Sequence, residues 1–570
     1  MRAPRKAFVL AAGLGTRLRP LTLETPKPML PLWGRPMLAH TLEMLAGWGV
    51  QQVLINLHHA PGPIVRYLAA QPFPQLRISA VFEPVILGTG GALRNARWFI
   101  DEPFWLLNAD IVAALDPAPL LKAWNRQKPL AACWLTEAAG PRTVRCENGF
   151  IRSFHDRQHG QATFCGLQLL DVRILPFIAP EGFDTIIAAY QRAQKKHFRV
   201  AGIVVPRSFW ADIGTPAQYV QAHRDTAGRF GHAGEAFTLP AAAVLTPRER
   251  RLQSMPDFRP VEVLPPRGSS REFFRLRPVA GRSNHIYKYS HYPVMLIRWS
   301  PERPENRLYA RHTRFLARLG LPVPRLQLDA PRDHVLAVED LGADTLESRL
   351  PGMRPADVRE LYNQILNLML RLHLRGLTAA RKARLPLMPG FDAKLYAWEH
   401  AYFLDNIVRE HLSVPEKQFT AIAVELKTVA RLLAASPQGL LHRDWQSSNI
   451  LFRGRQPVLI DYQGMRRGPA AYDVASLLCD PYVDLPAALQ MRLLAHYVRR
   501  HPQGAAIAAA FPAAAVQRLC QALGAYAVLS KKPGMARFAN YVPVAARQLL
   551  RALPALPLPA LAAAVRRLTR

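Results

Sequence analysis

The sequence predicts an α/β fold in at least two domains, and three observations support this prediction. With 570 residues the chain is too long for a single hydrophobic core. Apolar runs typical of buried strands alternate with segments of helical periodicity through its N-terminal part. Hydrophobic residues make up 49% of the chain and charged residues 20%, a composition that indicates a globular protein and excludes a disordered one.

The first apolar run and the turn after it organise the N-terminal part of the chain. The run from Phe8 to Ala12 ends in Gly13-Leu14-Gly15-Thr16-Arg17, and Pro26-Lys27-Pro28 follows. Glycine has no side chain and tolerates positive φ, so the backbone N–H groups of such a turn can approach phosphates closely. Arg17 and Lys27 bring cationic groups to the same place.

The same stretch has a second interpretation as a secretory signal. Arg2, Arg5 and Lys6 precede the apolar run as the charged region of a signal peptide would. The run is short, however, and Gly13 and Gly15 interrupt it. We therefore favour a buried strand followed by a phosphate-binding turn.

Alternating elements follow in order. Helical spacing of apolar residues predicts a helix over Met37–Trp48, and strands are predicted at Val50–Leu57, Ile78–Phe82 and Pro103–Leu107. This alternation is typical of a mostly parallel sheet, which binds ligands at the carboxyl ends of its strands.

Two motifs lie at those predicted strand ends. The first is the glycine-rich segment Leu87–Ala92, for which an ordinary loop is the alternative. The second is Leu106–Ile111, in which Asp110 ends an apolar strand. A carboxylate in that position is costly without a cation or a hydrogen-bond partner, so Asp110 is a candidate metal ligand, with a helix N-cap as the alternative.

These motifs together resemble the signature of sugar-1-phosphate nucleotidyltransferases. That signature reads G-x-G-T-R-L-x-P, then P-K-P, then L-G-T-A/G-G, and Phe209–Pro216 resembles its W-x-D-V-G-T-P motif. The resemblance covers about Lys6 to Ala222 and implies a Rossmann-like domain. The absence of hexapeptide repeats makes the short N-acetylmuramate 1-phosphate uridylyltransferases the most similar branch, and the base and sugar specificity stays open.

The resemblance also implies roles for individual residues. Asp110 and Asp212 would hold Mg²⁺ between the nucleotide and the sugar phosphate, while Arg17 and Lys27 would stabilise the developing charge. Gly166, in the strand Phe164–Leu167, would face the sugar. The implied nucleotide contacts are Ala12, Gly13, Gly15, Thr16, Gly88, Thr89 and Gly90.

A change of composition marks the predicted domain boundary. Residues 226–264 contain several prolines and a charged cluster and are predicted to be a linker. The nucleotidyltransferase-like domain then spans 1–225 and a second domain spans 265–570.

The second domain carries a motif for phosphoryl transfer. Leu441–Ile450 contains H-R-D-x-x-x-x-N, and Asp461 follows Asn449 by twelve residues. Phosphoryl transfer needs a base that orients the acceptor and two oxygen ligands for metal, and Asp444, Asn449 and Asp461 supply all three at the required spacing.

This domain resembles the aminoglycoside-phosphotransferase branch of the kinase-like fold. The hinge-like Val338–Gly342 and the segment Gly468–Asp473 carry the resemblance beside the catalytic motif, and Asp473 would be a structural anchor of the catalytic loop. The resemblance implies two lobes, Asp444 as the base, and Asn449 and Asp461 holding Mg²⁺ on ATP. The implied nucleotide contacts are Gly268, Ser269, Ser270, Arg298, Glu339 and Leu341.

Arg298 stands where kinases place a phosphate-pairing lysine, and the two side chains are not equivalent. A second domain that binds nucleotide without turnover therefore remains an alternative.

The two resemblances together suggest a bifunctional enzyme of cell-wall sugar recycling. Its kinase would use ATP to phosphorylate the anomeric hydroxyl of N-acetylmuramate or N-acetylglucosamine, and its nucleotidyltransferase would use UTP to form the UDP-sugar. The runner-up is a choline kinase joined to a phosphocholine cytidylyltransferase, which would need an aromatic cage. The candidate cage residues are Trp398, Tyr402, Phe403 and Trp445.

The charge and the cysteine content limit which partners and which cellular compartment we expect. The net charge of +33 is scattered along the chain, so we expect polyphosphate substrates and no nucleic-acid partner. Five distant cysteines without C-x-x-C indicate neither a zinc site nor disulfides and suggest a cytoplasmic protein.

Ala505–Leu529 is predicted to be two packed helices, with no membrane insertion. The C-terminal 549–570 segment is predicted to pack on the kinase lobe, with membrane-surface binding as its alternative, and the oligomeric state stays open.

Overall fold

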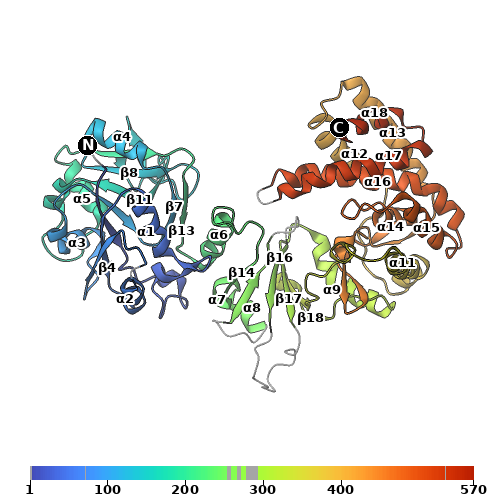
Figure 1. The fold of residues 1–570 in the computed structure, drawn as a ribbon, viewed down its shortest axis with the longest axis horizontal. Coiled ribbons are helices and arrows are strands. Elements are labelled where there is room, and N and C mark those ends of the chain that lie inside the picture. The colour runs from blue at the N-terminus through green and yellow to red at the C-terminus, as the bar shows by residue number, and fades with distance from the viewer. Residues whose placement is uncertain are drawn as a thin grey trace, which may run out of the picture. The chain divides into compact units, whose positions relative to one another are not determined.

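The computed structural model describes residues 3–70, 72–252, 259–265, 271–277, 293–532 and 535–569. The chain forms two compact units, Met1–Val261 and Glu262–Arg570 (Figure 1). The predicted phosphate-covering turn Gly268–Ser270 lies outside the described residues.

The N-terminal unit is built on a nine-stranded sheet that confirms the predicted Rossmann-like α/β fold. The sheet is mixed and not mostly parallel as predicted. The central strand β11 runs antiparallel to both of its neighbours, β6 and β8. In spatial order the strands are β5 (Arg77–Phe82), β4 (Gln52–Leu57), β1 (Lys6–Leu10), β6 (Phe104–Asn108), β11 (Thr163–Leu170), β8 (Ala131–Thr136), β12 (Val200–Val204), β10 (Phe150–Ser153) and β9 (Arg145–Glu147).

Helices cover both faces of this sheet (Figure 1). Alternate residues of β1 point to opposite faces, so Val9 packs in one core and Phe8 in the other. Helices α1 (Met37–Gly47), α2 (Gly62–Ala69) and α4 (Ala118–Gln127) contribute to the first core, and α3 (Gly88–Asn95) and α5 (Ile186–Gln194) contribute to the second.

Short strands beside the main sheet carry part of the predicted site. Strand β7 (Ile111–Ala114) pairs antiparallel with β13 (Phe209–Asp212), and β2 (Pro31–Leu32) pairs with β3 (Arg35–Pro36). Helix α6 (Pro216–Thr226) follows, with the Thr215 hydroxyl accepting the Gln218 backbone N–H as an N-cap.

The segment predicted as a linker contains regular structure. Its elements are β14 (Phe237–Pro240), α7 (Ala241–Val244), α8 (Pro247–Leu252) and β15 (Pro260–Val263). Its first residues pack on the N-terminal unit, where His232 stacks on Trp33 with ring centroids 4.4 Å apart. The boundary between the two compact units falls within β15.

The C-terminal unit begins with an antiparallel sheet. Strand β15 is followed across this sheet by β16 (Arg271–Leu276), β17 (Val294–Trp299), β19 (Val335–Glu339) and β18 (Leu326–Ala330). Helix α9 (Tyr309–Arg318) packs against it through Phe315 and Leu316.

The rest of the unit is mainly helical. Its helices are α10 (Leu346–Arg349), α11 (Pro355–Lys382), α12 (Ala393–Phe403), α13 (Glu416–Ala434), α14 (Ala470–Leu478), α15 (Ala487–Val498), α16 (Gly504–Ser530), α17 (Val542–Ala552) and α18 (Pro559–Val565). Two antiparallel pairs join them, β20 (Gln438–Leu441) with β23 (Arg466–Pro469) and β21 (Ile450–Arg453) with β22 (Gln456–Leu459). This arrangement confirms the predicted two-lobed kinase-like fold.

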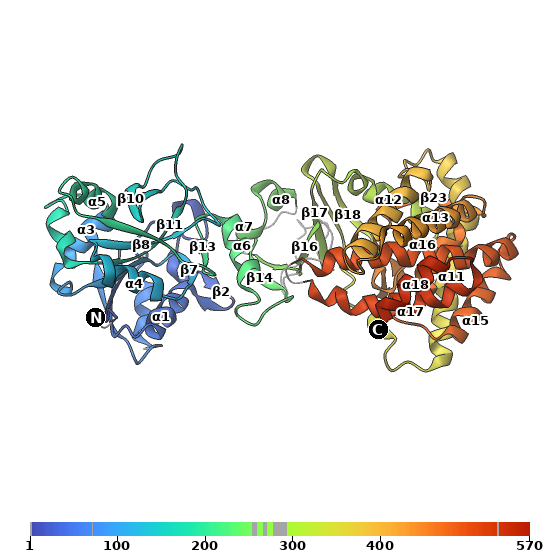
Figure 2. The same ribbon diagram turned by 90° about the horizontal axis from the view of Figure 1, so that it is seen from above.

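The prediction of two packed helices over Ala505–Leu529 is wrong, because α16 is one helix with Pro512 inside it. Proline removes one backbone hydrogen bond and normally interrupts a helix. Here α16 packs against α12, α13, α14 and α17, of which α12, α13 and α17 are labelled beside it in Figure 2. This burial offsets the cost of the lost hydrogen bond. By length and composition it is also the one helix among the described residues that could span a membrane, and 67% of its most apolar window is buried within the protein.

Candidate active sites

The predicted carboxylate pair of the N-terminal unit is assembled by a two-stranded ladder. Asp110 lies in the turn between β6 and β7, and Asp212 is the last residue of β13. Because Asp212 pairs with Ile111 in the register of this ladder, it stands next to Asp110. The Ile213 backbone N–H also donates to the Asp110 carbonyl at 3.4 Å.

Lys27 lies between these two carboxylates. Its Nζ is 2.5 Å from Asp110 Oδ2 and 3.8 Å from Asp212 Oδ1, and the residue is only 8% exposed. Burial raises the pKa of Asp212 above its ordinary value, and the neighbouring Asp110 charge acts in the same direction, although Lys27 opposes both. The site therefore gathers two carboxylates around one buried ammonium group.

Arg17 approaches the same pair from the first turn. The turn is held by a hydrogen bond of 2.7 Å from the Thr22 hydroxyl to the Gly15 carbonyl, with Gly15 at φ +60°. Arg17 packs on Gly214, where an added Cβ would lie 2.8 Å from the Arg17 guanidinium. The predicted Gly13, in the same turn, faces open space.

The predicted base-binding segment has a structural reason for its glycines. Gly88 adopts φ +76°, and a Cβ there would stand 2.3 Å from the Asp184 carbonyl oxygen. Gly90 N–H donates to that oxygen at 2.9 Å, and the Thr89 hydroxyl accepts the Ile186 N–H at 2.8 Å. The segment is thus locked onto the start of α5, and its Thr89 side chain is already engaged.

Gly166 permits a close approach inside the main sheet. It lies at φ +73° where the register between β11 and β8 shifts, and a Cβ there would be 2.8 Å from Asn108 Nδ2. The adjacent Cys165 carbonyl accepts a hydrogen bond of 2.9 Å from Trp210 Nε1. These contacts join β11 to the strand that carries Asp212.

Two polar residues that the sequence did not single out connect the first turn to the glycine-rich segment. Asn56 Oδ1 accepts the Ala11 N–H at 2.7 Å, and Asn56 Nδ2 donates to Glu83 Oε1 at 2.8 Å. Glu83 Oε2 in turn accepts the Leu87 N–H at 3.3 Å. Asn56 interrupts an apolar strand and Glu83 directly follows another, which is the signal that could have revealed them.

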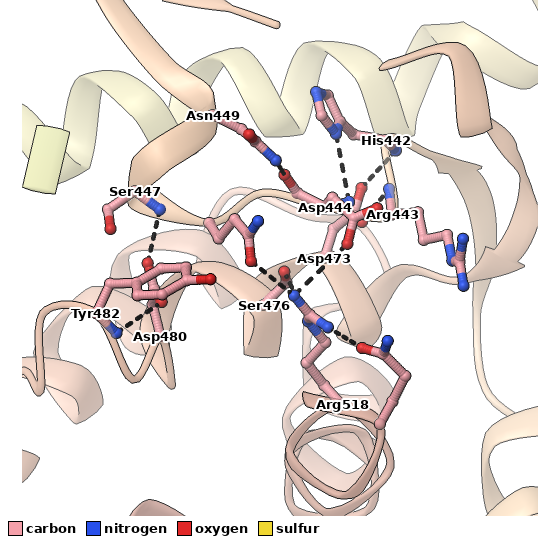
Figure 3. Close-up of polar contacts among 12 residues, drawn as sticks. His442, Arg443, Asp444, Ser447, Asn449, Asp473, Ser476, Asp480, Tyr482 and Arg518 are labelled. Carbon is pink, nitrogen blue, oxygen red and sulfur yellow. Dashed lines mark hydrogen bonds and ion pairs between the residues drawn. The ribbon is translucent and has the colours of Figure 1, made fainter. Parts of the chain in front are cut away.

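The catalytic loop of the C-terminal unit is anchored by a buried carboxylate, as predicted. Asp473 accepts the backbone N–H groups of His442 and Arg443, each at 2.8 Å (Figure 3). His373 Nε2 lies 3.2 Å from the same carboxylate. Since Asp473 is fully buried, this anchor fixes the backbone that carries Asp444.

Asp444 has a cationic neighbour that the sequence did not reveal. Arg518 of α16 lies with its Nη2 3.5 Å from Asp444 Oδ1 and 3.0 Å from Gln446 Oε1. Its Nε donates to the Ser476 hydroxyl at 3.2 Å, and it also binds Gln521. Figure 3 shows the Arg518 side chain pointing toward the catalytic loop.

The structure brings the two predicted metal ligands of this unit together. Asn449 precedes β21 and Asp461 follows β22, and the Ile460 N–H donates to the Asn449 carbonyl at 3.0 Å. Asn449 Nδ2 donates to the Asp444 carbonyl at 3.1 Å. Hydrogen bonds to backbone groups therefore link the candidate base Asp444 to Asn449, and Asn449 to the residue before Asp461.

Asp461 pairs with Arg271 of β16, another residue that sequence reasoning missed. Burial favours the neutral acid, but the Arg271 charge outweighs it and holds the pKa of Asp461 below its ordinary value. Gln463 Nε2 also donates to Asp461 Oδ1, at 2.9 Å. A cation thus already faces the predicted phosphate site from the sheet.

Arg298 occupies the opposite face of that sheet. In the β16–β17 ladder Arg271 pairs with Trp299, whereas Arg298 pairs with Glu272. Directly opposite residues share a face and successive residues alternate, so Arg298 and Arg271 point to different sides. Arg298 donates to Glu272 Oε2 at 3.0 Å, and the structure does not bring it to Asp461.

The predicted hinge follows β19. Glu339, the last residue of that strand, forms two hydrogen bonds with Arg453, at 2.9 and 2.5 Å. Burial raises the pKa of Glu339, but its contacts with Arg453 outweigh burial and hold this pKa below its ordinary value. Leu341 is half-buried beyond it. The pair joins the sheet to the β21–β22 hairpin.

The candidate choline cage is not assembled. Phe403 and Trp445 are fully buried in the core. Trp398 and Tyr402 stack on each other along α12, with ring centroids 5.3 Å apart. In the described parts of the chain, no group of three or more His, Cys, Asp or Glu side chains is arranged to hold a metal ion.

Comparison with known proteins identifies both halves. Residues 6–151 match the nucleotidyl transferase family, and residues 275–511 match the phosphotransferase enzyme family. Among curated proteins, mannose-1-phosphate guanylyltransferase of Mycobacterium tuberculosis is 28% identical over 262 residues, which cover 42% of this chain and 71% of that protein. The catalytic subunit beta of the Dictyostelium discoideum enzyme is 30% identical over 230 residues, covering 38% of this chain and 62% of that protein, less than two thirds of its length.

Two solved structures are similar to this chain over about 40% of its length. UDP-glucose pyrophosphorylase from Acinetobacter baumanii has a TM-score of 0.35 at 17% identity and covers 40% of this chain and 94% of its own. The inositol-1-phosphate CTP transferase of T. maritima has a TM-score of 0.35 at 17% identity, and the match covers 39% of this chain and 97% of that one.

Proposed function

Because the chain joins a nucleotidyltransferase domain to a phosphotransferase domain, we propose that it activates a sugar in two steps. The phosphotransferase domain uses ATP to phosphorylate the anomeric hydroxyl of an amino sugar, N-acetylmuramate or N-acetylglucosamine. The nucleotidyltransferase domain then uses UTP to convert the sugar 1-phosphate into a UDP-sugar and pyrophosphate. The observation that carries the proposal is the presence of two charged centres in one chain, Asp110 with Asp212 and Asp444 with Asp461, whose reactions follow one another.

The donor sets of both centres fit Mg²⁺. Asp110 and Asp212 are adjacent, about a third exposed (34% and 31% for their side chains), and offer hard carboxylate oxygens. Asn449 uses its Nδ2 on the Asp444 carbonyl, which leaves Oδ1 for a cation beside Asp461. A bound metal would supply neutralisation and orientation of the phosphates.

In the first step the anomeric oxygen attacks the γ-phosphorus of ATP, the bond to the β-phosphate oxygen breaks and ADP leaves. Asp444 accepts or orients the proton of the attacking hydroxyl. Arg518 holds one oxygen of that carboxylate, and Arg271 supplies positive charge from the sheet side.

In the second step a phosphate oxygen of the sugar 1-phosphate attacks the α-phosphorus of the nucleoside triphosphate, and pyrophosphate leaves. Arg17 and Lys27 offset the negative charge that grows on the phosphate oxygens. Lys27 is positioned for this between the two carboxylates.

The identities of the sugar and of the nucleotide base are the most specific part of the proposal. The names of the curated relatives refer to mannose 1-phosphate and guanylyl transfer, so GTP and mannose belong in any test beside UTP and amino sugars.

The test is ³¹P NMR of the purified protein with MgATP and one acceptor at a time, from N-acetylmuramate, N-acetylglucosamine, mannose and choline. UTP, GTP or CTP is added afterwards. We expect an anomeric sugar phosphate that is consumed only after the second nucleotide is added, with a diphosphate diester as product. Formation of phosphocholine, or ATP binding without transfer to any acceptor, would contradict the proposal.

A further inference from the structure

A cavity in the C-terminal unit lies apart from the candidate catalytic residues. Its volume is about 390 Å³, within the range of small-molecule sites. It lies between α9 and the end of α11. Its walls are formed by Arg311, Arg314, Phe315, Arg318 and Leu319 on one side and by Ala379, Ala383 and Leu385 on the other.

The α9 wall is strongly basic. Arg311, Arg314 and Arg318 are spaced three and four residues apart, so they share one face of the helix over about 10 Å. Arg314 is neutralised by Asp329, 2.9 Å away. The guanidinium groups of Arg311 and Arg318 form no ion pair or hydrogen bond with other side chains in the described parts of the chain, and no lining residue is acidic.

The remaining lining is apolar. Phe315, Leu319 and Leu385 together with two alanines form a wall opposite and between the arginines. A ligand that fits both surfaces needs an anionic part for the guanidinium groups and a flat or apolar part for this wall. Two free guanidinium groups match two phosphates better than one.

We infer that this cavity binds the nucleoside diphosphate moiety of a small ligand, with the phosphates on Arg311 and Arg318 and the base against Phe315. Both free ADP and a nucleotide sugar contain this moiety. The inference does not depend on the reactions proposed above, because it rests on the cavity alone.

Two residues of α9 that do not line the cavity connect this helix to the candidate catalytic centre. His312 contacts the Tyr462 carbonyl at 3.2 Å and the Pro386 carbonyl at 2.8 Å, and the Thr313 hydroxyl bonds to the Tyr462 hydroxyl at 2.8 Å. Tyr462 directly follows Asp461 in the chain. A ligand that braces α9 against residues 379–385 therefore also restrains the turn that carries Asp461.

The test is hydrogen–deuterium exchange of the full chain in EDTA, which minimises metal-dependent nucleotide binding in the two catalytic centres. ADP, UDP and UDP-N-acetylglucosamine are titrated separately, with uridine and inorganic pyrophosphate as half-ligands. We expect protection of peptides covering 309–319 and 379–385, and much weaker protection by either half-ligand. Comparison of ADP with the nucleotide sugar identifies the source of the moiety.

The decisive variant combines Arg311→Glu with Arg318→Glu. It should raise the ligand concentration that gives half-maximal protection at least tenfold. Arg359→Glu on the exposed side of α11 is the matched control and should leave it unchanged. Circular dichroism melting checks that each variant is folded. Equal protection in the double variant, or no protection by millimolar diphosphates in a folded wild-type protein, would overturn the inference.

Discussion

At the scale of single residues, the structure separates glycines needed for folding from those available to a ligand. Gly88 has positive φ, and an added methyl group would collide with the Asp184 carbonyl. Gly13 is in open space and has no positive φ, so the same methyl group meets nothing in the protein.

Substitution of these two glycines by alanine should therefore have opposite effects. Gly88→Ala should lower the free energy of unfolding by about 1 to 3 kcal/mol, because it adds backbone strain and a steric clash. Gly13→Ala should leave stability unchanged but weaken nucleotide binding about tenfold or more, because the methyl group stands where phosphates approach the backbone. Thermal unfolding and nucleotide titration of both variants check this. A stable Gly88→Ala protein would contradict the assignment.

A second residue-scale prediction concerns acid stability. His223 is buried against Phe237, with ring centroids 4.8 Å apart, and burial lowers its pKa to about 4. The unfolded chain, with a pKa near 6.5, binds the proton first, so stability is full above pH 6.5 and is lost as pH falls toward 4. Lowering the pH from 7 to 4.5 should cost about 2 to 3 kcal/mol through this group.

Urea unfolding followed by tryptophan fluorescence measures this cost, since Trp33 lies 5.7 Å from His223 between ring centroids. The His223→Gln variant should show a smaller dependence on pH. An identical pH dependence in wild type and variant would rule out His223 as a source of the acid sensitivity.

At the scale of elements, α16 contributes to the candidate catalytic centre from a distant part of the sequence. It delivers Arg518 to Asp444 and Gln446. The prediction is that Arg518→Met lowers the kcat of the kinase reaction at least tenfold, because a displaced base loses its alignment with the acceptor. Arg518→Lys should recover part of it. The KM for ATP and the nucleotidyl transfer activity should not change.

Steady-state kinetics of both reactions in one preparation is the measurement. If Arg518→Met instead raised only the KM for the acceptor sugar, Arg518 would bind substrate and not position Asp444.

The elements also explain which parts of the structure the sequence could predict. Asp110, Asp444 and Asp461 lie shortly after short strands and Asn449 lies directly before one, so local pattern was enough to single them out as candidates. Arg518, Arg271 and the Asn56–Glu83 connection depend on contacts between segments far apart in the chain, which no local pattern records. Pro512 misled the prediction because burial on several sides of α16 outweighs its local preference.

At the scale of the whole molecule, the two proposed reactions should be separable by mutation. Asp444→Ala should abolish ATP-dependent sugar phosphorylation but spare nucleotidyl transfer to supplied sugar 1-phosphate. Asp110→Ala should do the reverse. Assays of each half-reaction, and of a mixture of the two variants, check this.

The mixture should regain the complete conversion, because each variant supplies what the other lacks. Loss of both activities in a single folded variant would show that the division of labour is wrong.

The contact of Lys27 with both Asp110 and Asp212 has a consequence for handling the protein. The lysine ammonium acts as an internal counter-ion, so the repulsion between the two carboxylates is reduced even when no other cation is present. One of the two negative charges is thus offset from within the protein, and a divalent ion that bound between the carboxylates would have to displace one of the protein's own side chains.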